Sequence, residues 1–188
     1  MKALFISDLH GYRSILKRLD ITLSKYKDIK AMFCCGDLTS ATSDNTLFIK
    51  ELKEIIYKYK LIFKTICGNS DSQAMRKLFI KNGWHLDEEM IGRRTFVGVD
   101  FGYEQYFTGR SVASKILLTH VPPRTKILEQ GLINCPIIHF AGHRHFAEGE
   151  KNFPSTRLIQ IKSAQLGRAA IFNLKNLSLK FIDLEKAS

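Results

Sequence analysis

Apolar residues in the first part of the chain alternate between short continuous runs and stripes at helical spacing. The runs at residues 2–7, 31–35 and 61–67 are short, and the first ends in polar residues while glycine closes the other two, which is typical of buried strands. Between them, apolar residues recur every three or four positions over residues 15–26 and 47–59, which predicts two amphipathic helices. A strand–helix–strand–helix–strand order predicts parallel strands joined by right-handed crossovers.

The second part of the chain has many short apolar runs and few helical stripes. We expect strands at residues 94–99, 115–119, 137–141, 157–162, 168–173 and 177–183, and short helical turns at 73–81 and 125–131. With few long helices to serve as crossovers, this half is predicted to be largely antiparallel. No repeat or Pro/Gly/Ser-rich linker interrupts the pattern, so we expect one α/β sandwich domain over residues 1–188.

Composition places the chain among ordinary globular proteins, with 45% hydrophobic and 25% charged residues in 188 positions. The first apolar run meets Asp8 and His10 before it reaches the length of a signal peptide, and no stretch is long enough to span a membrane. We therefore expect a cytoplasmic protein with no membrane partner.

The four cysteines show no metal-binding spacing. No CxxC pair occurs, and two of the cysteines are adjacent, so that in a strand they face opposite ways. We interpret all four as small buried hydrophobic residues: Cys34, Cys35, Cys67 and Cys135.

The charge is strongly positive, because 29 Lys and Arg outnumber 18 Asp and Glu to give +11. Such a surface attracts anions, including phosphate esters and nucleic acids. No basic cluster is dense enough to mark a nucleic-acid site, so the charge alone does not choose between these partners.

Polar side chains follow each of the first three predicted strands. Asp8 and His10 come after the first strand, Asp37 after the second, and Asn69 and Asp71 after the third. Ligands of open α/β sheets bind at the carboxyl ends of the strands, so we expect these side chains to share one edge.

Histidines add to this edge from the second half of the chain. His120 ends an apolar run, and His143 and His145 follow another in the sequence GHRH, spaced to lie on one side of an extended segment. A lone histidine at a strand end is usually a core or capping residue, which is how we interpret His85 and His139. Two carboxylates, one amide and four histidines at one edge would cost several kcal/mol without a partner, and a cation supplies one.

The mixture of carboxylate, amide and imidazole suits Mn, Fe, Zn or Ni rather than Ca, whose sites contain oxygen ligands. Seven ligands are too many for one ion but suit two ions that share a bridging carboxylate. Such pairs lie about 3.5–4 Å apart and clamp the attacking and leaving oxygens of a displacement at phosphorus.

The motifs D-x-H, G-D, G-N-x-[DE], H and G-H-x-H occur in this order between residues 8 and 145. This ordered set resembles the calcineurin-like metallophosphoesterases, and in particular their small bacterial and archaeal phosphodiesterases. The resemblance implies a β-sandwich of mixed sheets flanked by helices, in four layers α/β/β/α.

The resemblance also distributes the candidate ligands over two divalent ions, with Mn as the first choice and Ni, Fe or Zn as alternatives. It implies a first site of Asp8, His10 and His145, a second site of Asn69, His120 and His143, and Asp37 as the bridge between them.

The same resemblance implies that Asn69, Asp71 and His120 act in catalysis, with Asp71 orienting a ligand rather than binding metal. Many members carry a histidine after the asparagine, where this chain has Ser70, although the small phosphodiesterases often lack it as well. Because a general acid contributes about 10²–10⁴ in rate, the leaving group is expected to have a low pKa or to be assisted by metal.

Arg144 and Arg124 lie beside predicted ligands and are candidates for contact with a substrate phosphate, since guanidinium matches that geometry. The alternative for each is a solvent-exposed arginine. The aromatic residues between 96 and 107 either stack on a base, form a dimer face or belong to the core, so a homo-oligomer stays open.

These observations together predict a metal-dependent phosphoesterase that hydrolyses phosphodiesters, and also monoesters, through a metal-bridging hydroxide at a dinuclear site. Its substrate is a phosphate ester such as a nucleotide. Two alternatives remain: a nuclease acting on DNA or RNA, which the charge encourages and Ser70 disfavours, and a catalytically silent protein-binding scaffold of the same fold.

Overall fold

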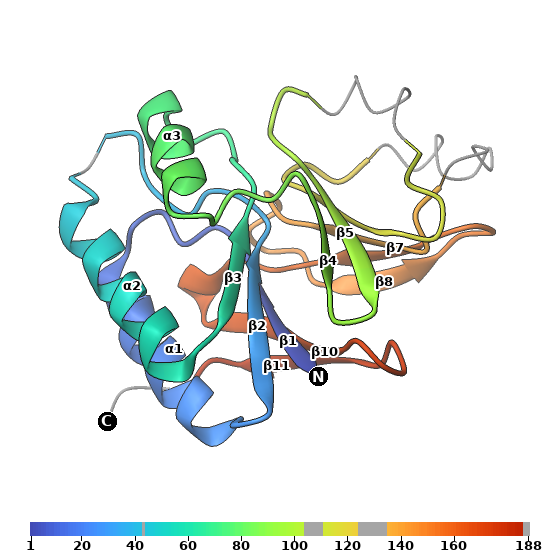
Figure 1. Ribbon diagram of the computed structural model, residues 1–188, viewed down its shortest axis with the longest axis horizontal. Helices are drawn as coiled ribbons and strands as arrows, with labels where there is room; N and C mark the ends of the chain where they lie inside the picture. Colours follow the sequence, from blue (N-terminus) through green and yellow to red (C-terminus); the bar gives the residue numbers. More distant parts are fainter. Residues whose placement is uncertain (43, 104–110, 124–134, 186–188) are drawn as a thin grey trace.

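The computed structural model describes residues 1–188 except 43, 104–110, 124–134 and 186–188 (Figure 1). Two β-sheets pack face to face, and helices lie on the outer side of the first sheet. The predicted class of two mixed sheets flanked by helices is therefore confirmed. No helix within the described ranges has the length and apolarity needed to cross a bilayer.

The first sheet has the strand order β11-β10-β1-β2-β3. Its strands are β1 (Lys2–Ile6), β2 (Ile29–Cys34), β3 (Ile62–Thr65), β10 (Arg168–Asn173) and β11 (Leu179–Asp183). The helices are α1 (Arg13–Lys25), α2 (Thr46–Tyr59) and α3 (Gln73–Lys81). The strands β1, β2 and β3 are parallel, as the alternation of runs and stripes predicts, while β10 and β11 are antiparallel additions.

The second sheet has the order β4-β5-β6-β7-β9-β8. Its strands are β4 (Glu88–Ile91), β5 (Arg94–Val99), β6 (Ile116–Thr119), β7 (Ile138–Ala141), β8 (Gly149–Asn152) and β9 (Arg157–Gln160). The expectation of a largely antiparallel second half is wrong for this sheet, because β5, β6, β7 and β9 are mutually parallel and only the edge pairs are antiparallel. The connections between the parallel strands exceed the dozen or so residues that a crossover needs, although the sequence predicts no more than the short helical turn at 125–131 within them.

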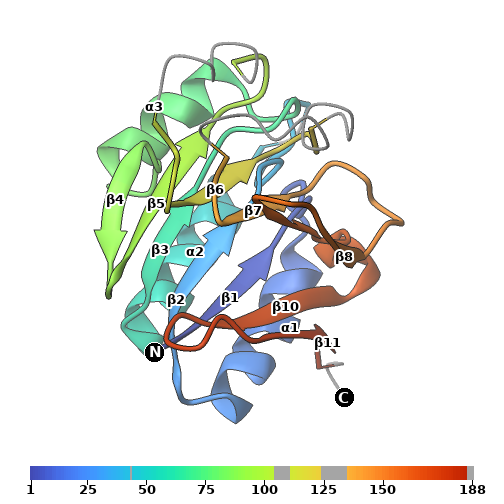
Figure 2. The same cartoon turned by 90° about the vertical axis from the view of Figure 1, so that its right-hand side faces the viewer.

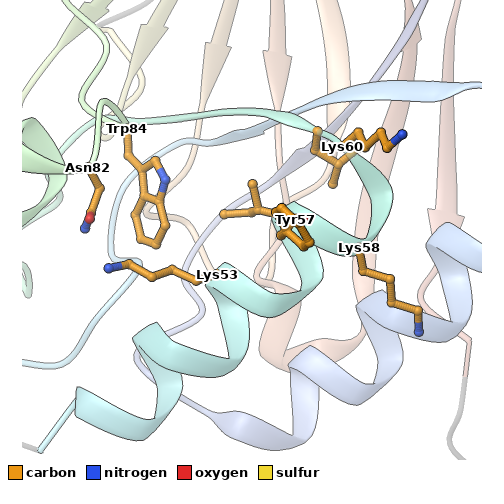
Figure 3. Close-up of a pocket in the computed structure, with 8 residues that line it drawn as sticks. Lys53, Tyr57, Lys58, Lys60, Asn82 and Trp84 are labelled. Carbon is orange, nitrogen blue, oxygen red and sulfur yellow. The ribbon is translucent and has the colours of Figure 1, made fainter.

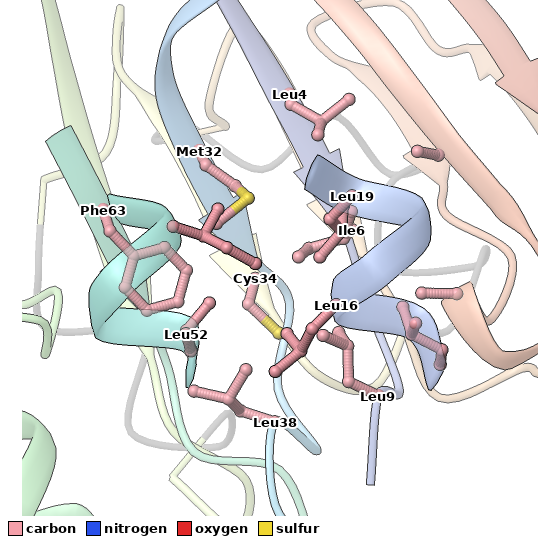
Figure 4. Packing of buried hydrophobic residues seen from close by; sticks show 14 of the residues in the cluster. Leu4, Ile6, Leu9, Leu16, Leu19, Met32, Cys34, Leu38, Leu52 and Phe63 are labelled. Carbon is pink, nitrogen blue, oxygen red and sulfur yellow. The ribbon is translucent and has the colours of Figure 1, made fainter. Parts of the chain in front are cut away.

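Side chains along β1 point alternately to the two faces of the first sheet, so the core has two layers. Leu4 and Ile6 point toward the helices, where they join Leu16, Leu19 and Leu52 in one apolar cluster (Figure 4). The three described α-helices all contribute to this helix-side core. The helical turn expected at 125–131 lies outside the described residues, so the second outer layer is not described.

The other face of β1 joins the two sheets. Phe5 stacks on Phe140 of the second sheet with ring centroids 3.7 Å apart, and Phe33 stacks on Phe96 at 4.4 Å. These fully buried rings hold the sheets face to face. In this arrangement, the carboxyl ends of β1, β2 and β6 point to the same end of the molecule (Figure 2).

The cysteine prediction is confirmed for Cys34, Cys35 and Cys67, which are free and buried. Burial raises the pKa of each of these thiols, which keeps them protonated and unreactive. Cys135 is free but only half-buried, so the prediction that it is buried is wrong.

Candidate metal centre

The loops that leave the strands hold four candidate ligands in a strained backbone conformation. Asp8, His10, Asp37 and His143 have φ between 48° and 66°, in the left-handed region that non-glycine residues rarely adopt. Such conformations cost about 1–3 kcal/mol each and persist where the surrounding structure enforces them, often at functional sites. Here the first two loops are tied together, because the His10 amide donates to the carbonyl of Asp37 at 2.9 Å.

Three of the side chains form one half of a compact cluster. His145 Nε2 lies 3.2 Å from Asp8 Oδ1 and 3.4 Å from His10 Nε2. Together with Asp37, these residues place one ligand atom each within 4.8 Å of one another. Metal–ligand bonds of about 2.0–2.2 Å set neighbouring ligand atoms roughly 3 Å apart, so this spacing fits an ion at the centre.

Three other side chains form the second half. His120 Nε2 lies 3.0 Å from Asn69 Oδ1 and 3.2 Å from His143 Nδ1, and the remaining distance, from His143 Nδ1 to Asn69 Oδ1, is 3.1 Å. Two imidazole nitrogens and one amide oxygen therefore converge on one point. The structure brings together all seven predicted ligands; the assignment of each to a metal stays a prediction.

A single oxygen of Asp37 joins the two halves. Asp37 Oδ2 lies 3.6 Å from His10 Nε2 and 3.4 Å from His120 Nε2. Burial alone would raise the pKa of this carboxyl group, but His120, the Ser70 amide and His10 together lower the pKa below its ordinary value. Asp37 is thus an ionised carboxylate placed where a bridging ligand belongs.

Asp8 provides the test of whether a cation fits. Its side chain is fully buried, and Oδ2 accepts a hydrogen bond from the His143 amide at 3.1 Å. Oδ1 has no hydrogen-bond partner in the described part of the chain, and its contact with His145 Nε2 lacks hydrogen-bond geometry. A buried carboxylate oxygen without a partner is costly, and a cation between Asp8, His10 and His145 would satisfy it.

Neighbouring groups orient the ligands. His120 Nδ1 donates to the carbonyl of Cys35 at 2.8 Å, which leaves Nε2 as the nitrogen that faces Asp37 and Asn69. Outer hydrogen bonds of this kind fix the tautomer of metal-binding histidines. Gly36, with φ 89°, makes the approach of His120 possible, since a Cβ there would lie 2.6 Å from Nδ1.

The residues after Asn69 bind the candidate bridge and its loop. The Ser70 amide and hydroxyl donate to the two oxygens of Asp37 at 2.7 and 3.0 Å. Asp71 accepts from the amides of Thr39 and Gly68 at 2.8 and 2.9 Å. Burial raises the pKa of Asp71 to about 6, against the lowering effect of these bonds. A role for Asp71 in orienting a ligand agrees with this position, and its catalytic role stays a prediction.

The predicted substrate contacts are less well defined. Arg144 is exposed between His143 and His145, and its phosphate contact stays a prediction. Arg124 lies outside the described residues, as do two of the aromatic residues considered, Tyr106 and Phe107.

Sequence reasoning missed a second cluster behind the Asn69 loop. Asp100 accepts from Arg76 Nε at 2.7 Å, from the Cys67 amide at 2.7 Å and contacts His85 Nε2 at 2.9 Å. Burial would raise the pKa of Asp100, but these partners, His85 first, hold it below its usual value. Asp100 also follows a buried strand, so the rule that found Asp8 and Asp37 could have found it.

The fold and the donor set define a class: two-sheet α/β proteins with a possible metal centre at the carboxyl edge of their parallel strands. A family model described as the calcineurin-like phosphoesterase superfamily domain matches residues 1–160, and the chain belongs to this superfamily. Membership indicates a hydrolase of phosphate esters in a dimetal-dependent family. The predicted family is thereby confirmed.

Solved structures share the fold at low sequence identity. The protein TT1561 of Thermus thermophilus has a TM-score of 0.73 at 10% identity, with 98% of this chain and 99% of that chain covered. A dimetal phosphatase from Danio rerio has a TM-score of 0.65 at 10% identity, with 98% and 99% covered. The phosphoesterase Yfce from E. coli has a TM-score of 0.56 at 14% identity, with 98% and 100% covered. No curated protein matches the sequence.

Proposed function

We propose that the protein is a phosphodiesterase that uses two divalent metal ions, with Mn as the first choice, and that it also accepts monoesters. The observation that carries this proposal is the pair of three-ligand groups joined by one oxygen of Asp37. Within the described residues, no lysine or arginine forms an ion pair with Asp8 or Asp37, so their charge calls for another cation.

Each half of the cluster would hold one ion. The residues that would do so are Asp8, His10 and His145 for the first ion, Asn69, His120 and His143 for the second, and Asp37 for both. When bound, two such ions lower the pKa of a water and neutralise charge that develops on the phosphoryl group.

The protein's own side chains offer little acid to the leaving group. Ser70 donates its hydroxyl hydrogen to Asp37 and is therefore committed to positioning. His120 commits Nδ1 to the Cys35 carbonyl. Without a general acid worth about 10²–10⁴ in rate, esters with low-pKa leaving groups react fastest.

The proposed substrates are aryl or nucleotide phosphodiesters. We further propose that residues 1–188 form one domain and that the protein acts in the cytoplasm. Arg144, exposed between two candidate ligands, would bind a non-bridging phosphate oxygen. The chain's net charge of +11 favours such anions without selecting among them.

Hydrolysis of an aryl phosphodiester beside the matching monoester tests the proposal, with metal-stripped protein and Mn, Ni, Zn or Mg added back. We expect metal-dependent turnover that favours the diester. His143→Ala should abolish turnover, while Arg144→Gln should raise KM with a smaller effect on kcat.

Two results would contradict the proposal. Folded protein that is inactive with every metal would favour the protein-binding scaffold. Cleavage of DNA or RNA that exceeds diester turnover and falls steeply with salt would favour the nuclease.

A further inference from the structure

A hollow of about 580 Å³ lies beside the C-terminal half of α2, bounded by the turn into β3 and by the segment that follows α3 (Figure 3). None of the seven candidate metal ligands lines it. Its apolar wall includes Ile56, Leu61 and Trp84, a residue that is only 7% exposed. The volume lies in the range of about 300–1,000 Å³ that small-molecule sites occupy.

The charged residues that line this hollow are all lysines. Lys58 is paired with Asp20, at 2.7 Å between Nζ and Oδ1. In the described part of the chain, Lys53 and Lys60 lie within ion-pair distance of no carboxylate. Lys53 Nζ lies 5.9 Å from the centroid of the Trp84 ring, so one uncompensated charge stands beside the aromatic wall.

An amide adds a second donor at the same end. Asn82 lines the hollow next to Trp84, and its Nδ2 is buried with no acceptor among the described residues (Figure 3). A buried donor without a partner costs about 1–3 kcal/mol. Among the described residues, neither Asn82 Nδ2 nor Lys53 Nζ has an acceptor, and both side chains lie next to the Trp84 ring.

We propose that this hollow binds a small aryl phosphate, a planar apolar group that carries a dianion. The phosphate oxygens accept from Lys53 and, after a rotation of its amide, from Asn82, and the planar group packs along Trp84 and Ile56. Lys53 supplies one positive charge to the dianion, and Lys60 lines the far end of the hollow. This site is separate from the metal centre and does not depend on the proposed function.

Trp84 is the only tryptophan of the chain, so its fluorescence and its indole N–H resonance report on this site alone. Phenylphosphonate is the probe, because its carbon–phosphorus bond resists phosphoesterases. Titration into the metal-loaded protein should give saturable changes in both signals. Inorganic phosphate lacks the aryl group and phenol lacks the anionic group, so each should bind at least tenfold more weakly than phenylphosphonate.

Variants assign the signal to the lysines. Lys53→Gln should weaken phenylphosphonate about tenfold, the loss expected for one charge-assisted hydrogen bond, and Lys60→Gln should weaken it less. Lys50→Gln is the matched control, since Lys50 lies one helical turn away on α2 and does not line the hollow. It should bind like the wild type, and His143→Ala should keep the full Trp84 response.

The outcomes that overturn the proposal are distinct. No saturable change in either signal excludes the site, and thermal melts show whether each variant is folded. Equal affinity for inorganic phosphate would exclude a role for the apolar wall, and an unchanged affinity of Lys53→Gln would exclude the anion contact. Loss of the response in His143→Ala would place the ligand at the metal centre instead.

Discussion

Two clusters of acids and histidines lie around the segment that follows β3, and their buried carboxylates differ in the partners that stabilise them. In the first, Asp8 and Asp37 face histidines, and Asp8 Oδ1 has no hydrogen-bond partner within the described residues. In the second, Asp100 is surrounded by Arg76, His85 and the Cys67 amide. Both have the residue types of a metal site.

The difference between the clusters is the source of positive charge. Arg76 supplies a permanent cation to Asp100, so that carboxylate is satisfied by the chain itself. The Asp8–Asp37 cluster has no arginine or lysine partner in the described ranges and adopts strained backbone at four of its residues. This difference supports the proposal that the first cluster binds an external cation, whereas the chain itself supplies the cation of the second.

The largest expected effect concerns metal affinity. Asp37→Asn should weaken Mn binding by more than about 100-fold, because loss of an outer-shell partner alone costs about 10–100-fold and Asp37 is predicted to contact both ions. Asp100→Asn should leave Mn binding unchanged. Mn titration with both variants, checked by circular dichroism, distinguishes the clusters. If both variants weakened Mn binding equally, the two clusters would not differ in metal binding.

Metal removal should lower the free energy of unfolding through the first cluster and not through the second. At a Mn concentration 100 times Kd, each bound ion adds about 2.7 kcal/mol to the free energy of unfolding, and a chelator should reverse it. Urea unfolding with and without Mn measures this increment. Asp100→Asn should show the full increment from a lower starting stability, and Asp37→Asn should show almost none.

Asp100→Asn should itself lower the free energy of unfolding of metal-free protein by about 2 kcal/mol. Removing one partner of a buried pair costs about 3–5 kcal/mol, and partial hydration of Arg76 reduces that value here. Glu54→Gln, on the exposed side of α2, is the control and should stay within about 0.5 kcal/mol of wild type. A neutral effect of Asp100→Asn would mean that the second cluster does not stabilise the fold.

His139 shows what burial does to a histidine that has no acid partner. Its Nε2 contacts Thr119 Oγ1 at 2.8 Å, and burial lowers its pKa to about 3. The unfolded chain, with a pKa near 6.5, binds the proton better, so the contribution of His139 is complete above pH 6.5 and falls by about 1.4 kcal/mol per pH unit below it. His139→Gln keeps a donor for Thr119 and should flatten this loss.

Urea unfolding of chelator-treated wild type and His139→Gln between pH 7.5 and pH 5 measures the slope, with metal ligation removed from the comparison. Parallel pH dependence in the two proteins would show that His139 does not titrate on unfolding.

Much of the architecture around the site could be predicted because burial and local spacing encode it. The apolar runs at 2–7 and 31–35 contain β1 and most of β2, and the turn expected at 73–81 is α3. Parallel strands end together, so residues that follow β1, β2 and β3 had to meet. That constraint alone brings Asp8, Asp37 and Asn69 within reach of one another.

Features without a local signal were missed. The edge strands β4 and β8 are mostly exposed and carry polar residues, so no apolar run marks them. The parallel pairing of β5, β6 and β7 depends on long connections in which the sequence predicts no long helix. Ser70 bonds to Asp37 and Arg76 pairs with Asp100 only through tertiary contacts, which no spacing in the sequence reveals.

An anomalous difference map from crystals of the protein grown with Mn would show directly whether the cluster holds two ions. We expect two peaks about 3.5–4 Å apart, one at the Asp8–His10–His145 group and one at the Asn69–His120–His143 group, with Asp37 between them. No peak should lie beside Asp100. A single peak, or a peak among Cys67, His85 and Asp100, would rule out a two-ion centre bridged by Asp37.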